Sequence, residues 1–177
     1  DEYGDSKLRY ALFDNEGADE YDHIDLRTSS DFSWENGSSK FVFLRDLFSR
    51  DSQRDVGQEY TRSRYYHTYI NGQYWGVYQS MEKPKASYGE TYLGGNKEDY
   101  DAIKIYRDSV VQETFTILVT DGNFDAYERL WDACVNPAKG FDTIEKYMQI
   151  QGLNSDGTAN PNYECLVDVD NLIDFML

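Results

Sequence analysis

An Asn-Gly pair between two runs of strand-forming residues constrains the fold of this chain more than any other sequence feature. The pair is Asn71-Gly72, and the flanking runs, 64–70 and 73–79, are rich in tyrosine and β-branched residues. Asn and Gly are the residues that most readily adopt the positive φ angles of a type I′ turn. The sequence therefore predicts a β-hairpin closed by a two-residue turn.

A two-residue turn also fixes which residues face each other across the hairpin. With regular alternation, Tyr69 faces Tyr74 and His67 faces Gly76. Glu82 falls on that same face if the strand continues so far without a bulge. The opposite face is expected to be buried, and it carries Tyr66, Thr68, Ile70, Trp75 and Val77.

Gly76 is unusual because a glycine inside a strand weakens the strand unless another group must come close. Opposite His67, it leaves a shallow bay beneath the tyrosines of this face, Tyr69, Tyr74 and Tyr78. Two interpretations stay open. Either another side chain fills the bay, or a flat ligand such as a purine or a sugar lies over the sheet.

Hydrophobic periodicity predicts further elements on both sides of the hairpin. Short strands are expected over 23–27, 100–106 and 110–119. Helices are expected over 41–56, 126–135, 141–150 and 171–177. Gly57 is expected to end the first of these helices, and Asp125 and Asp170 to cap two of the others.

The order of these elements predicts an α+β fold with an antiparallel sheet and packed helices. The central hairpin occupies 64–82, and the helical part occupies 125–177. Residues 86–95 are expected to form a loop, and the acidic residues 1–23 a terminal arm before a domain over 24–177.

Composition excludes several classes of function. The net charge is −16, and the excess negative charge lies in 1–35 and 120–177. So acidic a chain repels phosphate, and we expect no nucleic-acid partner. No apolar run approaches the roughly 20 residues that span a bilayer. Because the chain begins with Asp1 and not Met, we expect it to be a processed piece of a longer protein.

Residues for familiar catalytic chemistry are scarce. The sequence has no Walker-type loop, no G-x-S-x-G and no cluster of Cys and His. Residues 121–125 have the first spacings of a calcium loop but lack its later ligands, so we interpret them as a turn. The acidic flanks are interpreted as solvated surface, with calcium binding as the alternative. Whether Cys134 and Cys165 pair is left open by the sequence.

The segment 69–82, Y-I-N-G-Q-Y-W-G-V-Y-Q-S-M-E, resembles the signature of the CotH family. In that signature, N-G-x-Y-x-G-x-Y is followed by a Glu. Other segments resemble elements of the same family in the same order, namely 26–30, 44–46, 101–104 and 167–177. The resemblance covers residues 24–177 and is strongest in 41–104.

The resemblance implies a fold similar to protein kinases, with an N-terminal lobe that binds ATP and magnesium, and a protein that acts outside the cell or at its surface. Carried over to matching positions, Gly72 and Gly76 would lie in the hairpin that covers the nucleotide. Glu82 and Lys104 would be the acid and the lysine near the phosphates and the metal. Arg45 would be a helix-borne partner for charge in the cleft.

The chain also departs from the family pattern. The family's catalytic aspartate and metal-binding aspartate come downstream of the helix that resembles 167–177, whereas this chain stops at Leu177. We therefore assign no catalytic residue and no metal ligand, and expect a lobe truncated before the catalytic region. Phosphoryl transfer is expected only in the full-length parent, with a protein substrate or a second chain as partner. The alternative is a non-catalytic extracellular domain that is structural or binds carbohydrate or calcium.

Overall fold

The computed structural model describes residues 4–28, 42–107, 115–136 and 142–176. The chain forms two compact units, Asp1–Tyr100 and Asp101–Leu177. Each unit combines antiparallel strands with helices, which confirms the expected α+β class. In the described residues, no helix is long and apolar enough to cross a membrane.

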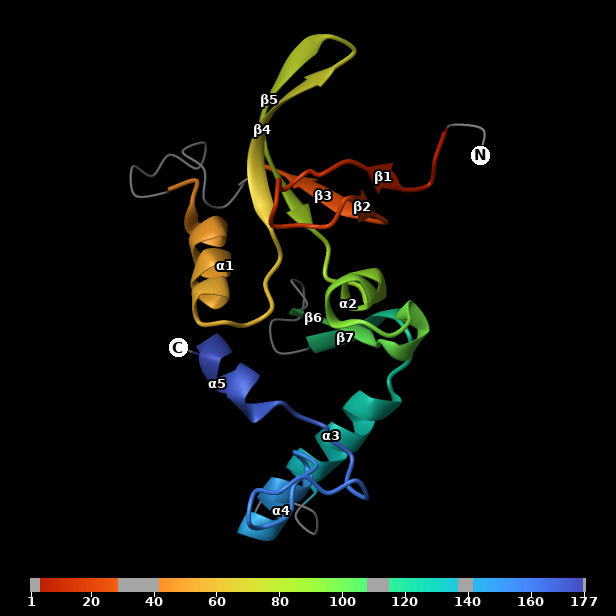
Figure 1. The fold of residues 1–177 in the computed structure, drawn as a ribbon, viewed down its shortest axis with the longest axis vertical. Coiled ribbons are helices and arrows are strands. Elements are labelled where there is room, and N and C mark those ends of the chain that lie inside the picture. Colours follow the sequence, from red (N-terminus) through yellow and green to blue (C-terminus); the bar gives the residue numbers. More distant parts are fainter. Residues whose placement is uncertain (1–3, 29–41, 108–114, 137–141, 177) are drawn as a thin grey trace. The chain divides into compact units, whose positions relative to one another are not determined.

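The first unit is built on a three-stranded antiparallel sheet in the order β3 (Ile24–Arg27), β5 (Gln73–Glu82) and β4 (Ser63–Ile70). Strand β3 pairs only with the last residues of β5, from Gln79 to Glu82. The rest of β4 and β5 forms a two-stranded ribbon that projects beyond β3 (Figure 1). The predicted hairpin is therefore confirmed, as is the short strand before it.

The turn at the end of the ribbon has the predicted form, because Asn71 has φ 50° and Gly72 has φ 81°. Ile70 faces Gln73 and Tyr69 faces Tyr74, as expected. Directly afterwards the register shifts between Thr68 and Tyr69.

The register shift is a β-bulge in which Trp75 is the extra residue of β5. Gly76 has φ 130°, a value that side chains disfavour, and it lies opposite Thr68. The predicted pairing of His67 with Gly76 is therefore wrong, and so is the bay expected between them. A bulge bends a strand and moves all later side chains by one position against the partner strand.

The face predicted to be buried is open instead. Trp75 is 56% exposed and Ile70 is 49% exposed. Within the ribbon, which the structure describes completely, no residue from 64 to 78 is buried. The alternation of tyrosines with smaller residues here reflects strand formation and not a buried face.

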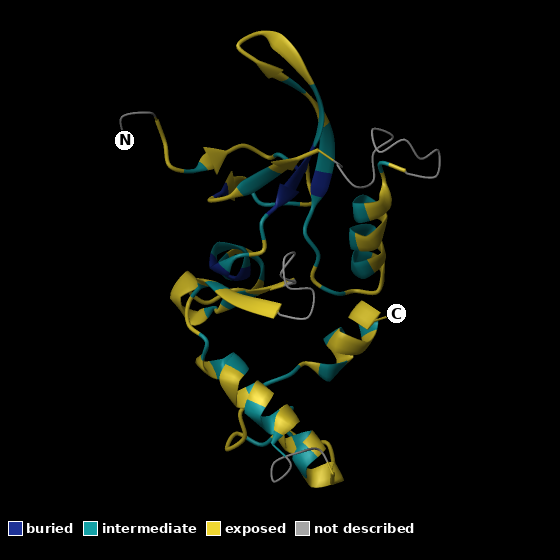
Figure 2. Cartoon of the chain, turned by 180° about the vertical axis from the view of Figure 1, so that it is seen from behind, coloured by how far each residue is buried: buried dark blue, intermediate teal, exposed yellow. Residues whose placement is uncertain are grey.

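Residues 4–23 fold back onto the sheet and do not form a loose arm. β1 (Leu8–Arg9) pairs with β2 (Glu20–Tyr21), and the loop between them carries Phe13, which is 0% exposed. The ring of Phe13 meets that of Tyr21 edge-on at a centroid distance of 5.6 Å. Figure 2 shows buried residues where β4, β5 and this hairpin meet, and further ones on α2.

Two α-helices belong to the first unit. Helix α1 (Arg45–Asp55) ends before Gly57, as predicted, and Gly57 has a positive φ. The predicted start at residue 41 is too early, because the described residues 42–44 are not helical. Helix α2 (Ala86–Leu93) replaces the loop predicted over 86–95, and a short 3-10 helix (Lys97–Asp99) follows. Gly89 lies inside α2 because a side chain there would come within 2.6 Å of the ring of Tyr100.

The second unit comprises a hairpin of β6 (Ala102–Arg107) with β7 (Phe115–Asp121), followed by the helices α3 (Asp125–Val135), α4 (Ile144–Gln149) and α5 (Val169–Met176). These elements match the predicted ones, although parts of three predicted segments, 110–114, 141 and 177, lie outside the described residues. Both cysteines are free thiols.

The predicted helix caps in the second unit are wrong by one or two residues. Asp125 is the first residue of α3, and its own N–H donates to the side-chain oxygen of Asn123 at 2.8 Å. For α5, it is Asp168 and not Asp170 that accepts the N–H of Asn171, at 2.9 Å. Among neighbouring acidic and amide residues, the backbone geometry decides which one caps the helix.

We predict that Gly76→Ala lowers the free energy of unfolding by about 1–2 kcal/mol, because an L-residue must then adopt a positive φ. Urea denaturation of the purified chain measures this change. Gln73→Ala, an exposed residue of the same ribbon, is the matched control and should have little effect. If Gly76→Ala is as stable as the parent chain, the positive φ at this position does not require glycine, and the prediction is wrong.

Candidate functional site

A buried ion pair lies at the base of the hairpin. Glu82, at the end of β5, is 2% exposed, and its Oε2 accepts from the backbone N of Arg62 at 2.8 Å and from Nη1 of Arg62 at 3.2 Å. Its Oε1 accepts from the hydroxyl of Tyr92 on α2. Protein donors therefore occupy both oxygens of this carboxylate.

The Arg62 guanidinium is enclosed as well. It lies over the ring of Tyr60 at 4.6 Å and over the ring of Tyr92 at 3.9 Å, and its Nε donates to the carbonyl of Glu16. Burial lowers the pKa of Arg62, but the Glu82 carboxylate together with Tyr92 and Tyr60 outweighs burial, and the pKa is raised. The pair is charged, and it is hydrogen-bonded on both sides.

Three tyrosines around this pair are held in the neutral form. Burial raises the pKa of Tyr21 to about 12, and the Glu82 charge adds to this effect. Burial also raises the pKa of Tyr88 to about 12. The pKa of Tyr92 rises further, first through burial and then through its hydrogen bond to Glu82. At neutral pH these phenols act as hydrogen-bond donors.

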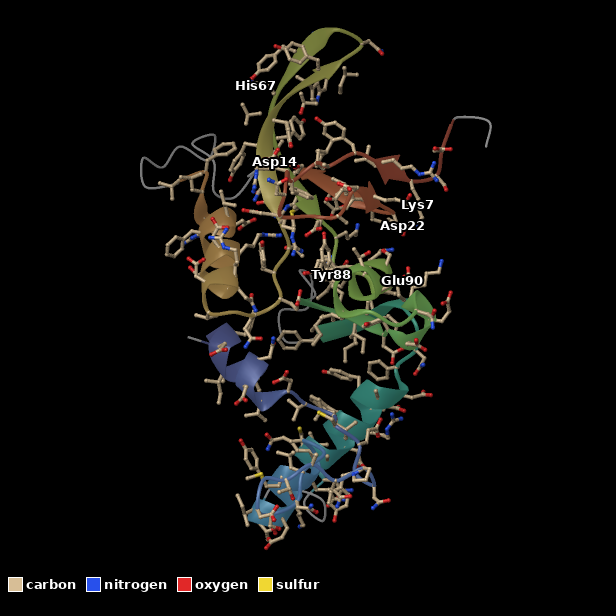
Figure 3. The ribbon with its side chains drawn as sticks, in the orientation of Figure 1. Lys7, Asp14, Asp22, His67, Tyr88 and Glu90 are labelled. Carbon is tan, nitrogen blue, oxygen red and sulfur yellow. The ribbon has the colours of Figure 1, made fainter. Side chains whose placement is uncertain are left out.

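A narrow hollow adjoins the buried pair, and its walls include Tyr21, Asp22, Glu82, Tyr88 and Tyr92. Figure 3 labels Asp22 and Tyr88, two of these lining residues. The free space is about 20 Å³, which holds a single water molecule and no nucleotide.

The structure separates the residues that the resemblance groups into one site. Gly72 lies in the exposed turn and Gly76 in the bulge, and both belong to the outer part of the hairpin. Glu82 lies six residues further along β5, which is about 20 Å at roughly 3.3 Å per residue. Arg45 is the first residue of α1, where its side chain is exposed. A common role for these residues stays a prediction.

Lys104 belongs to the second unit. It lies on β6 opposite Leu118, and its ammonium lies 4.4 Å from the centre of the Tyr106 ring. The residue is exposed. The predicted lysine-bearing strand is therefore present, while its proximity to Glu82 stays a prediction.

Sequence reasoning missed Arg62, which is the main partner of Glu82. The predicted register without a bulge places Thr61 opposite Glu82, whereas the bulged ladder, with Ser63 opposite Met81, places Arg62 there. The signal that could have revealed the pair is Gly76 itself, since a glycine inside a strand often marks a bulge.

The outer part of the ribbon carries a group of exposed aromatic side chains. Tyr69 is 62% exposed and Tyr74 is 50% exposed, and their ring centroids are 5.3 Å apart. The Tyr74 hydroxyl is 3.0 Å from Nδ1 of His67, which is labelled in Figure 3. In the described part of the chain, no group of three or more His, Cys, Asp and Glu side chains is arranged to hold a metal ion.

We predict that Glu82→Gln lowers the free energy of unfolding by about 3–5 kcal/mol, because the Arg62 guanidinium is then buried without a counter-charge. Urea denaturation followed by circular dichroism measures this. Glu164→Gln removes an exposed ion pair with Arg129 and serves as the control, with little expected change. A small effect of both substitutions would contradict a structural role for the buried pair.

We also predict that stability falls between about pH 10 and pH 12. Unfolded tyrosines lose their protons near pH 10, whereas Tyr21 and Tyr88 keep theirs to about pH 12, so alkaline pH favours the unfolded chain. Urea midpoints measured against pH test this. Tyr88→Phe should make the fall shallower, and Tyr10→Phe, at a residue that is 64% exposed, should not. Identical slopes for both variants would contradict the assignment.

Comparison with known proteins gives one match. A family model described as CotH kinase protein matches residues 5–177, which is nearly the whole chain. No curated protein and no solved structure matches the chain. The match includes the acidic residues that precede the signature and both structural units. The chain therefore belongs to the CotH kinase protein family.

Proposed function

We propose that this chain is the nucleotide-binding part of a CotH-type kinase that transfers a phosphoryl group from ATP with the help of magnesium. The β4–β5 hairpin carries the proposal. A side chain at Gly72 would meet nothing within 4 Å, and one at Gly76 would meet only the Tyr78 ring, at 3.8 Å. A ligand can therefore come close to the backbone of this ribbon at both glycines. A strand that covers phosphates requires such access.

The rest of the first unit is compatible with a kinase-like N-terminal lobe. A twisted antiparallel sheet carries the hairpin, and the side chains of α1 reach the sheet through Arg27 and Asp46, at 3.3 Å. On the second unit, Lys104 offers an exposed ammonium on a strand. We propose that it contacts the nucleotide phosphates.

Magnesium does not need a cage of protein ligands. It usually binds through one or two carboxylates together with substrate phosphates and waters. Exposed carboxylates are plentiful among the described residues, so binding as the Mg–ATP complex is chemically compatible with them. We assign the transfer step to the full-length parent, with a protein as acceptor, and propose that it acts outside the cell or at the cell surface.

The exposed aromatic ribbon favours a second candidate, carbohydrate binding. Tyr69, Tyr74 and Trp75 are each at least half exposed, and aromatic rings of this kind present flat apolar surface with polar edges. Sugars would stack on these rings without any contribution from Lys104.

We predict that the chain binds Mg–ATP and that Lys104→Ala weakens binding about tenfold or more, because a charge-assisted contact to phosphate is lost. Isothermal titration calorimetry measures both constants. Lys146→Ala changes another lysine of the same unit, one that pairs with Asp142, and is the control. Absence of binding heat with Mg–ATP in the parent chain would overturn the proposal, and oligosaccharide binding that Trp75→Ala abolishes would support the second candidate.

A further inference from the structure

An open hollow in the first unit is lined by two arginines and two hydroxyl side chains, in a chain that is otherwise strongly acidic. Its lining residues come from β3, α1 and the segment before β4, and they are Arg27, Asp46, Ser49, Arg50 and Thr61. Its volume is about 320 Å³, at the lower end of the range for small-molecule sites.

Arg50 is the unusual residue of this hollow. It is half-buried, and its Nη1 donates to the hydroxyl and the carbonyl of Thr61. Its Nη2 lies 3.6 Å from the Met81 sulfur, which is a weak acceptor. Burial lowers the pKa of Arg50. Within the described residues, no carboxylate forms an ion pair with this guanidinium, so its charge has only neutral hydrogen-bond partners.

Arg27 brings a second guanidinium to the same place. Its Nη1 lies 3.3 Å from an oxygen of Asp46 and 3.9 Å from the Met81 sulfur that Arg50 also contacts. Both guanidinium groups therefore converge on one thioether. Asp46 balances one of the two positive charges and fixes the position of Arg27, which leaves an excess positive charge in the hollow.

We propose that this hollow binds a phosphate-type oxyanion between Arg27 and Arg50, with the hydroxyls of Ser49 and Thr61 as further donors. Guanidinium groups form short, paired hydrogen bonds to such anions, and two of them with adjacent hydroxyls match a tetrahedral oxyanion. The proposal does not depend on nucleotide binding by the hairpin or by Lys104.

Titration of the full chain with pyrophosphate, by calorimetry and by phosphorus NMR, tests the site. Pyrophosphate should bind saturably, and Arg27→Gln should weaken binding about tenfold or more, as expected for loss of one charge-assisted contact. Arg50→Lys keeps the charge but not the planar fork and should also weaken binding. Arg54→Gln is the matched control on α1, because Arg54 pairs with Asp51 and Asp55, and it should bind like the parent chain.

Absence of saturable binding by the parent chain, or equal affinity in Arg27→Gln, would overturn the site. Since Arg27 is half exposed, this variant tests binding even if substitution of Arg50 unfolds the chain. A second arm uses ATP without magnesium. If ATP displaces pyrophosphate, the anion is part of a nucleotide, and if it does not, the hollow takes a free phosphate. Failure of the site would leave any effect of Lys104→Ala on Mg–ATP binding unchanged.

Discussion

The buried pair of Arg62 and Glu82 is the interaction on which the first unit depends. The pair joins the start of β4 to the end of β5, and Tyr92 ties it to α2. The Arg62 guanidinium also reaches the Glu16 carbonyl in the loop after β1. Four segments far apart in the sequence therefore meet at one carboxylate and one guanidinium, and no disulfide or extensive apolar core substitutes for them among the described residues.

Local sequence patterns predicted those elements that depend on the backbone preferences of the residues within them. The Asn71-Gly72 turn, the two strands and the end of α1 at Gly57 all follow from φ preferences of single residues. Residues 86–93 form α2 and not the predicted loop. Gly89 does not interrupt the helix, and its missing side chain leaves room for the ring of Tyr100. That contact is tertiary, so no local pattern carries it.

The candidate site was less predictable than the fold. Motif matching found Glu82 but not Arg62, because a single extra residue in β5 shifts the partner of every position after it. It also did not indicate the meeting of Arg27 with Arg50, which depends on how α1 lies against the sheet. Membership of the CotH kinase protein family is consistent with the motif, and the family's signature covers both the open ribbon and its buried base.

The bulge at Gly76 has a consequence for how the signature tolerates insertions and deletions. Because the bulge supplies the single-residue offset that brings Arg62 across from Glu82, the glycine at the outer end of the ribbon sets the pairing of charges about 20 Å away. If Trp75 were kept but the strands paired without the bulge, Thr61 would lie opposite Glu82, leaving a carboxylate in the interior with a neutral neighbour, whereas deleting Trp75 would remove the extra residue and leave Arg62 opposite Glu82. As long as the extra residue is present, the charge pair at the base of the strand thus depends on the bulge that Gly76 permits at its outer end.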